Sequence, residues 1–148
     1  MREVSIAGDG FRLLLRVAGY ERPSLESGDD ANWLAGEAEL TADVGGSFRA
    51  RRGVSLRTEE LVAFRHALRR LVKDLDGKAT LSHMEDELGC TISLHRGTGE
   101  LNAFVREHVP GVELRVEGVH TDQSYLQETA MQLDALVSDF PIKGDALC

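Results

Sequence analysis

Hydrophobic and polar residues alternate along the first third of the chain, which is the pattern of β-strands with one buried face. The clearest run places apolar side chains at every second position: Phe11, Leu13, Leu15 and Val17. A Gly8-Asp9-Gly10 turn precedes it, so residues 4–7 are expected to form a short partner strand. Residues 19–30 are polar and predict a loop. The alternation returns over residues 32–43, and Gly45-Gly46 then turns the chain into a strand over residues 48–56.

The first helix is predicted directly after these strands. Thr58 is expected to be its N-cap, and Glu59 and Glu60 suit the positive end of the helix dipole. Apolar residues then recur every three or four positions and predict one buried stripe: Leu61, Phe64, Leu68, Leu71 and Leu75. Asp76-Gly77 is expected to end the helix.

A second helix is predicted near the other end of the chain. It is expected to open at Thr121 or Asp122 and to end before Pro141. Its apolar side is predicted to consist of Leu126, Leu133, Leu136, Val137 and Phe140. Between the two helices, the pattern predicts four more strands at residues 79–84, 89–95, 100–107 and 112–118.

The order of strands, helix, strands and helix predicts an α+β fold, with an antiparallel sheet or sheets and two amphipathic helices packed on one face. The repeated order also suggests an internal strand-strand-helix duplication, with halves at residues 3–76 and 79–141. The length of 148 residues suits a single domain over residues 1–148. No apolar run approaches the ~20 residues of a membrane helix, and residues 1–6 lack the apolar stretch of a signal peptide. The default expectation is a cytoplasmic protein.

The net charge of −8 disfavours general nucleic-acid binding. The charge is unevenly distributed. Residues 44–73 hold eight basic and two acidic side chains, a net charge of +6, which leaves −14 for the rest of the chain. This basic strip, from Arg49 to Lys73, either steers a charged partner or is simply the solvated surface of a hairpin and a helix.

Residues suited to catalysis or metal binding are scattered. None of the five histidines has the spacing of a metal motif. His83 lies near the carboxylates of residues 85–87, which reads either as a metal or acid–base site or, more simply, as a solvated charged segment. Cys90 is expected to be a buried, reduced thiol because it alternates with Ile92 and Leu94, and Cys148 is expected to be frayed. We therefore expect no catalytic residue, no metal site and no cofactor.

The most informative segment for binding contains Asp29, Asp30 and Trp33. The only tryptophan begins a strand, and its alternation with Leu34 points it away from the core. Exposed aromatic residues beside acidic ones are frequent interface anchors, so these three residues are the predicted partner-binding site. The alternative is that Trp33 covers the second face of the sheet, while Asp30 and Asn32 fold the loop through side-chain hydrogen bonds.

Several short strings in the sequence resemble the WapI-type family of small bacterial immunity proteins. They are Gly19-Tyr20-Glu21-Arg22-Pro23, Asp30-Ala31-Asn32-Trp33-Leu34, Leu56-Arg57-Thr58-Glu59-Glu60-Leu61 and Asp122-Gln123-Ser124-Tyr125-Leu126. The resemblance covers residues 19–141 and implies a non-enzymatic cytoplasmic antitoxin. Such a protein would bind the nuclease domain at the C-terminus of a wall-associated, contact-dependent toxin. The strings are structural in character and carry no binding residues over to this chain.

A small acidic protein is suited to masking the basic cleft of a nuclease, because complementary charge speeds encounter. The basic strip Arg49 to Lys73 would repel the same partner unless it faces away. The alternatives are a module that binds another bacterial protein, a self-associating structural domain, a small-molecule enzyme, or an RNA-binding protein that uses the basic strip.

Overall fold

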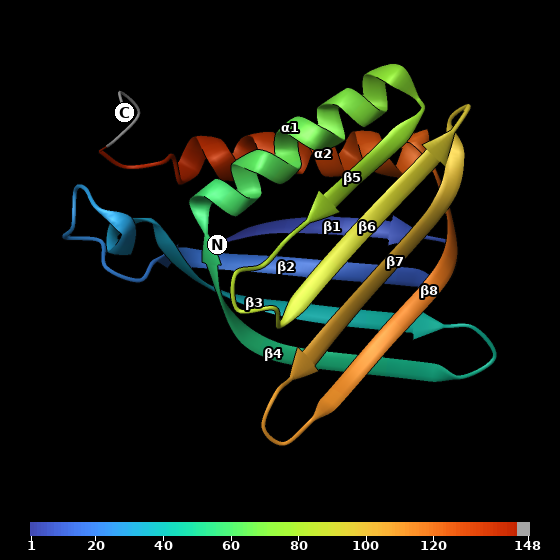
Figure 1. Ribbon diagram of the computed structural model, residues 1–148, viewed down its shortest axis with the longest axis horizontal. Helices are drawn as coiled ribbons and strands as arrows, with labels where there is room; N and C mark the ends of the chain where they lie inside the picture. The colour runs from blue at the N-terminus through green and yellow to red at the C-terminus, as the bar shows by residue number, and fades with distance from the viewer. Residues whose placement is uncertain (145–148) are drawn as a thin grey trace.

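The computed structural model describes residues 1–144 and contains two antiparallel four-stranded sheets and two helices (Figure 1). The first half of the chain forms β1 (Arg2–Gly8), β2 (Phe11–Tyr20), the 3-10 helix η1 (Asp29–Asn32), β3 (Trp33–Asp43), β4 (Ser47–Arg57) and α1 (Thr58–Asp74). The second half forms β5 (Gly77–Leu81), β6 (Leu88–His95), β7 (Thr98–Glu107), β8 (Val112–Asp122) and α2 (Gln123–Asp139). The predicted α+β fold with antiparallel sheets and two helices is confirmed.

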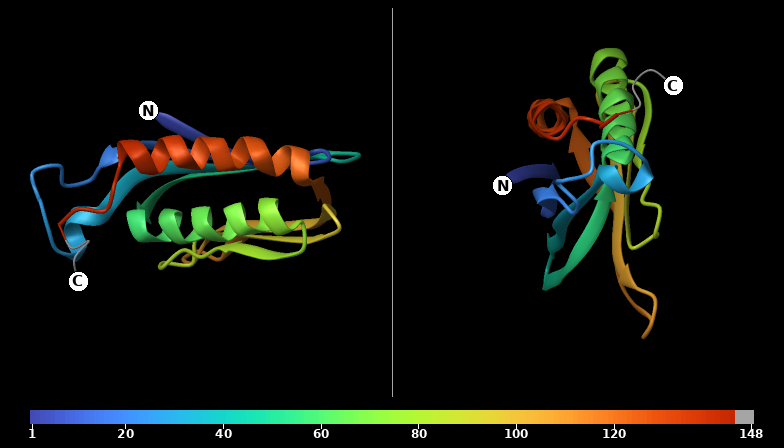
Figure 2. Two further views of the ribbon diagram at one scale, coloured as in Figure 1. Left: turned by 90° about the horizontal axis from the view of Figure 1, so that it is seen from above. Right: turned by 90° about the vertical axis from the view of Figure 1, so that its left-hand side faces the viewer.

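Each sheet is built from strands that are consecutive in the sequence, in the orders β1-β2-β3-β4 and β5-β6-β7-β8. The sheets lie face to face as two layers (Figure 2). Alternation along each strand directs one set of side chains between the layers, where they form a single core. Leu13 and Leu15 of β2 and Ile92 of β6 are examples, and none of the three is exposed to solvent.

Most of the predicted apolar stripes is buried, with Leu61, Phe64, Leu68 and Leu71 from α1 and Leu126, Leu133 and Leu136 from α2 in the core. The other three predicted members, Leu75, Val137 and Phe140, are only partly buried; Leu75 and Phe140 are the C-caps that follow the helices. The helices do not lie across a sheet face, however. They lie along the edges of the sheets, side by side, and close one margin of the sandwich (Figure 2). The physical reason is that the inner faces already cover each other, so the uncovered apolar margin is the one beside β1 and β5.

Each helix packs beside the first strand of the other half of the chain. α1 lies next to β5, and α2 lies next to β1 (Figure 1). Side chains of α2 bind the backbone of Ser5 on β1: Ser5 N–H donates to Gln132 Oε1 at 2.7 Å, and Thr129 Oγ1 donates to Ser5 O at 2.6 Å. These bonds give the edge of β1 the partners that a neighbouring strand would otherwise supply.

The start of α1 differs from the prediction. Thr58 is the first helical residue, not the N-cap, and its hydroxyl donates to Asn32 O at 3.1 Å. Glu60 stabilises this end instead, because its Oε1 accepts from Arg57 N–H at 2.8 Å. At α2 the N-cap is Asp122, one of the two predicted residues, and its side chain accepts from Ser124 N–H. In the described part of the chain, neither helix has the length and apolar character needed to cross a bilayer.

Candidate protein-binding surfaces

The predicted binding residues lie at the junction between the long loop and β3. Asp29 and Asp30 open the 3-10 helix η1, and Trp33 begins β3. Both aspartates are exposed, and Asp30 Oδ2 accepts from Arg22 Nη1 at 3.3 Å. Trp33 is half-buried and lies outside the hydrophobic core. The predicted outward orientation of Trp33 therefore agrees with its position.

Residues distant in sequence complete this surface. The Arg57 guanidinium lies 5.6 Å from the centre of the Trp33 ring, in cation–π geometry. A hollow of about 170 Å³ beside the ring is lined by Glu21, Arg22, Asp30, Trp33, Ser55 and Glu85. We call Glu21, Asp29, Asp30, Trp33 and Glu85 the acidic surface. Glu85 could not be assigned to it from sequence, because only the packing of the β5–β6 loop brings it there.

Asn32 anchors the loop through the segment that follows α2, not through a local turn. Its Oδ1 accepts from Lys143 N–H at 2.7 Å, and its side chain is buried. The ammonium of Lys143 donates to Leu25 O at 2.8 Å and to Pro23 O at 3.3 Å. These contacts fix the loop on both sides of Asp29 and Asp30. The backbone that carries the acidic surface is therefore held in one position by the segment after α2.

The basic strip Arg49 to Lys73 is divided in the structure. Its first part lies on β4 and its second part on α1, at opposite margins of the sandwich (Figure 1). Nearby carboxylates pair with most of its arginines. The pairs are Arg49–Glu39, Arg51–Glu37, Arg52–Glu87, Arg52–Glu107, Arg57–Glu59, Arg65–Asp134 and Arg69–Asp134. The Arg51 guanidinium, 3.0 Å from Glu37, also lowers the pKa of that carboxyl. The strip is not one continuous positive surface.

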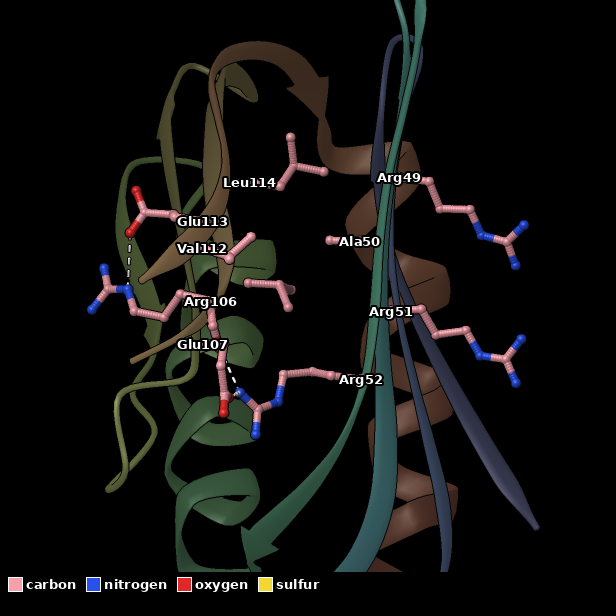
Figure 3. Close-up of a pocket in the computed structure, with 10 residues that line it drawn as sticks. Arg49, Ala50, Arg51, Arg52, Arg106, Glu107, Val112, Glu113 and Leu114 are labelled. Atoms are coloured by element: carbon pink, nitrogen blue, oxygen red, sulfur yellow. Dashed lines mark hydrogen bonds and ion pairs between the residues drawn. The ribbon is translucent and has the colours of Figure 1, made fainter. Parts of the chain in front are cut away.

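A larger cleft lies between the two sheets at the margin opposite the helices. It has a volume of about 490 Å³ and lies between β4 on one side and the β7–β8 hairpin on the other. Ala50 and Arg52 point into it from β4, facing Val112 and Leu114, while Arg49 and Arg51 point away (Figure 3). Arg52 spans the cleft and pairs with Glu107. Sequence patterning did not single out this cleft, because its two walls come from different halves of the chain.

Cys90 and His83, the side chains best suited to chemistry, are both buried in the fold. Burial raises the pKa of the Cys90 thiol to about 12, which removes the thiolate needed for nucleophilic attack. His83 is buried, with Nε2 2.7 Å from Ser55 O and Nδ1 accepting from Glu87 N–H at 3.2 Å. It joins the β5–β6 loop to β4. Within residues 1–144, no three His, Cys, Asp or Glu side chains are grouped to hold a metal ion. Cys148, expected to be frayed, lies outside the described residues.

The comparison with known families matches nearly the whole chain. The model of the immunity protein WapI-like family covers residues 5–141, which include every strand apart from the first residues of β1, and both helices. No curated protein matches the chain. The family match spans both sheets and the acidic surface, so it concerns the complete fold and not a single motif. The chain belongs to the WapI-like family of immunity proteins.

Proposed function

We propose that this protein neutralises a toxin domain in the cytoplasm by binding it directly, without catalysing a reaction. The observation that carries the proposal is the match to an immunity protein family over residues 5–141. The surroundings of Cys90 and His83 are consistent with it, because burial and hydrogen bonding suit both side chains to structural roles.

We further propose that the toxin is a nuclease and that the acidic surface contacts it. A nuclease needs a positive cleft to hold nucleic acid, and a partner with a net charge of −8 complements it. Trp33 supplies an amphipathic ring beside Asp30, a combination frequent among interface anchors. The basic strip is expected to repel a basic toxin less than its sequence suggests, since ion pairs offset the charge of most of its arginines.

The direct test is co-expression of this chain with the toxin domain encoded beside it. Host survival is expected when both proteins are made, and loss of growth when the toxin domain is made alone. Binding of the purified proteins should slow as salt rises, because screening shortens the reach of surface charge. Death of the host despite soluble immunity protein would contradict the proposal for that toxin.

Two substitutions test the acidic surface. Trp33→Ala is expected to weaken binding by more than about 2 kcal/mol if the ring is a central anchor, and Asp30→Asn is expected mainly to lower the association rate. The matched controls are Met131→Ala and Glu128→Gln, both exposed on α2. Binding and rescue that survive loss of Trp33, Asp29 and Asp30 together would place the interface elsewhere.

A further inference from the structure

We infer that the cleft between β4 and the β7–β8 hairpin receives an extended strand of the toxin, which pairs with the free edge of β4. This inference rests on the proposed function and adds a second contact to it. The cleft is separate from the acidic surface, and its residues suit a different kind of contact.

The first argument is that the edge of β4 is available. β4 is the last strand of its sheet, so the backbone groups on one of its sides have no neighbouring strand. Ser55 O lies on that side, because it accepts from His83 at 2.7 Å instead of from β3. Backbone groups of alternate residues point to the same side, so those of Arg49 and Arg51 also face outward. His83 covers the edge at Ser55, and the Arg52 side chain covers it at Gly53, because Arg52 Nε donates to Gly53 O at 3.1 Å. The inferred pairing therefore concerns the part of the edge formed by Arg49 and Arg51.

The second argument is the apolar lining next to this edge. Phe48, Ala50, Val54 and Leu56 alternate along β4 and share its inner face. Val54 and Leu56 are buried, but Phe48 is 50% exposed, because the hairpin no longer covers β4 at this end. Val112 on the opposite wall is 63% exposed. A strand with apolar side chains at alternate positions would remove these surfaces from water.

The third argument identifies the occupant by charge. Arg49 and Arg51 stand on the outer face of β4, and on β3 the residues Glu39 and Glu37 pair with them. Their side chains remain 60% and 56% exposed, which leaves room for carboxylates on the other side. A second copy of β4 would instead place arginine beside arginine, and like charges across strands are destabilising. The fitting occupant is a segment in which acidic and apolar residues alternate.

The test compares two substitutions in the β7–β8 hairpin. Val112→Asp puts a carboxylate into the cleft, where the apolar side chains of the bound strand would bury it without a partner, so toxin binding is expected to weaken about 10-fold or more. Val109→Asp is the matched control, because Val109 is 85% exposed and lies in the hairpin turn outside the cleft lining. Both variants should unfold at the same denaturant concentration as the unsubstituted protein to within the effect of a surface change.

Hydrogen exchange supplies the second measurement. The amides of Arg49 and Arg51 are expected to become protected when the unsubstituted protein binds the toxin domain, and to remain unprotected at any concentration of the free protein. Equal toxin binding by both variants, with unchanged exchange at these amides, would overturn the inference and leave the proposed function standing. Protection that grows with the concentration of the free protein would assign the edge to a second copy. No binding by the unsubstituted protein would overturn the proposed function as well.

Discussion

Cys90 and His83 illustrate how surroundings decide the role of a reactive side chain. The thiol of Cys90 lies on the inner face of β6, on the same side as Ile92, and is buried. That position was predictable, because alternation along a strand assigns each side chain to a face. The role of His83 was not, since its partner Ser55 lies in a different sheet. Charged neighbours in the sequence gave no sign of that contact.

The Cys90 thiol is expected to react slowly while the protein is folded. A pKa of about 12 leaves a thiolate fraction at about pH 8 that is on the order of a thousandfold smaller than in the unfolded chain. The measurement is thiol labelling of a Cys148→Ser variant, which leaves one cysteine, with and without denaturant. Equal rates in the two conditions would contradict the burial of Cys90.

For Trp33, the sequence predicts the orientation of the ring but not the side chains that surround it. Alternation with Leu34 placed the ring outside the core, in agreement with its half-buried position. The guanidinium of Arg57 over the ring and the carboxylate of Glu85 beside it depend on how β4 and the β5–β6 loop pack. Local pattern therefore predicted the centre of the acidic surface and not its surroundings.

Among the elements, both helices and all eight strands were predicted near their observed positions. The helix predicted after Thr58 and ended by Asp76-Gly77 is α1, Thr58–Asp74, and the strand predicted over residues 100–107 is β7, Thr98–Glu107. Periodicity is a local property, so it locates elements well. It does not say which elements touch. The position of α2 beside β1 depends on contacts between residues more than a hundred positions apart, such as Thr129 and Ser5.

Thr129→Val tests the attachment of α2 to β1. The substitution keeps the shape of a buried side chain but removes the hydroxyl that donates to Ser5 O. Leaving that carbonyl without its partner is expected to cost about 1–3 kcal/mol of unfolding free energy. Denaturant unfolding measures the cost, and Thr129→Ser, which keeps the donor, is the control. A Val variant as stable as the unsubstituted protein would show that this hydrogen bond adds no stability.

Across the molecule, ion pairs join basic side chains to carboxylates in both sheets and on both helices. Within residues 1–144, four carboxylates have lowered pKa values: Glu37, Glu113, Asp122 and Asp139. The largest cause is a hydrogen bond from an arginine at three of them and from the Ser124 hydroxyl at Asp122. These interactions favour the ionised form of each group, and therefore link the stability of the fold to pH.

Stability is expected to fall in acid. A carboxyl with a lower pKa in the folded state than in the unfolded state stabilises the fold above the unfolded pKa of about 4, and this contribution is lost as pH falls through the folded pKa. The urea midpoint should therefore be lower at about pH 3 than at about pH 7, and the difference should shrink in about 1 M salt. Equal midpoints at the two pH values would show that the four carboxylates add no stability.

Because α2, the last helix, packs beside β1, the first strand, the position of α2 also decides when a newly made chain can finish folding. Of the eight strands described, β1 is synthesised first, yet the backbone groups of Ser5 meet their partners only after Thr129 and Gln132 have been synthesised. Until then the nascent chain presents an open strand edge, which other chains can pair with. The edge of β1 is therefore closed only after the codons for α2 have been translated. A fragment that ends before α2 is expected to keep this strand edge open, because it lacks the side chains that bind Ser5.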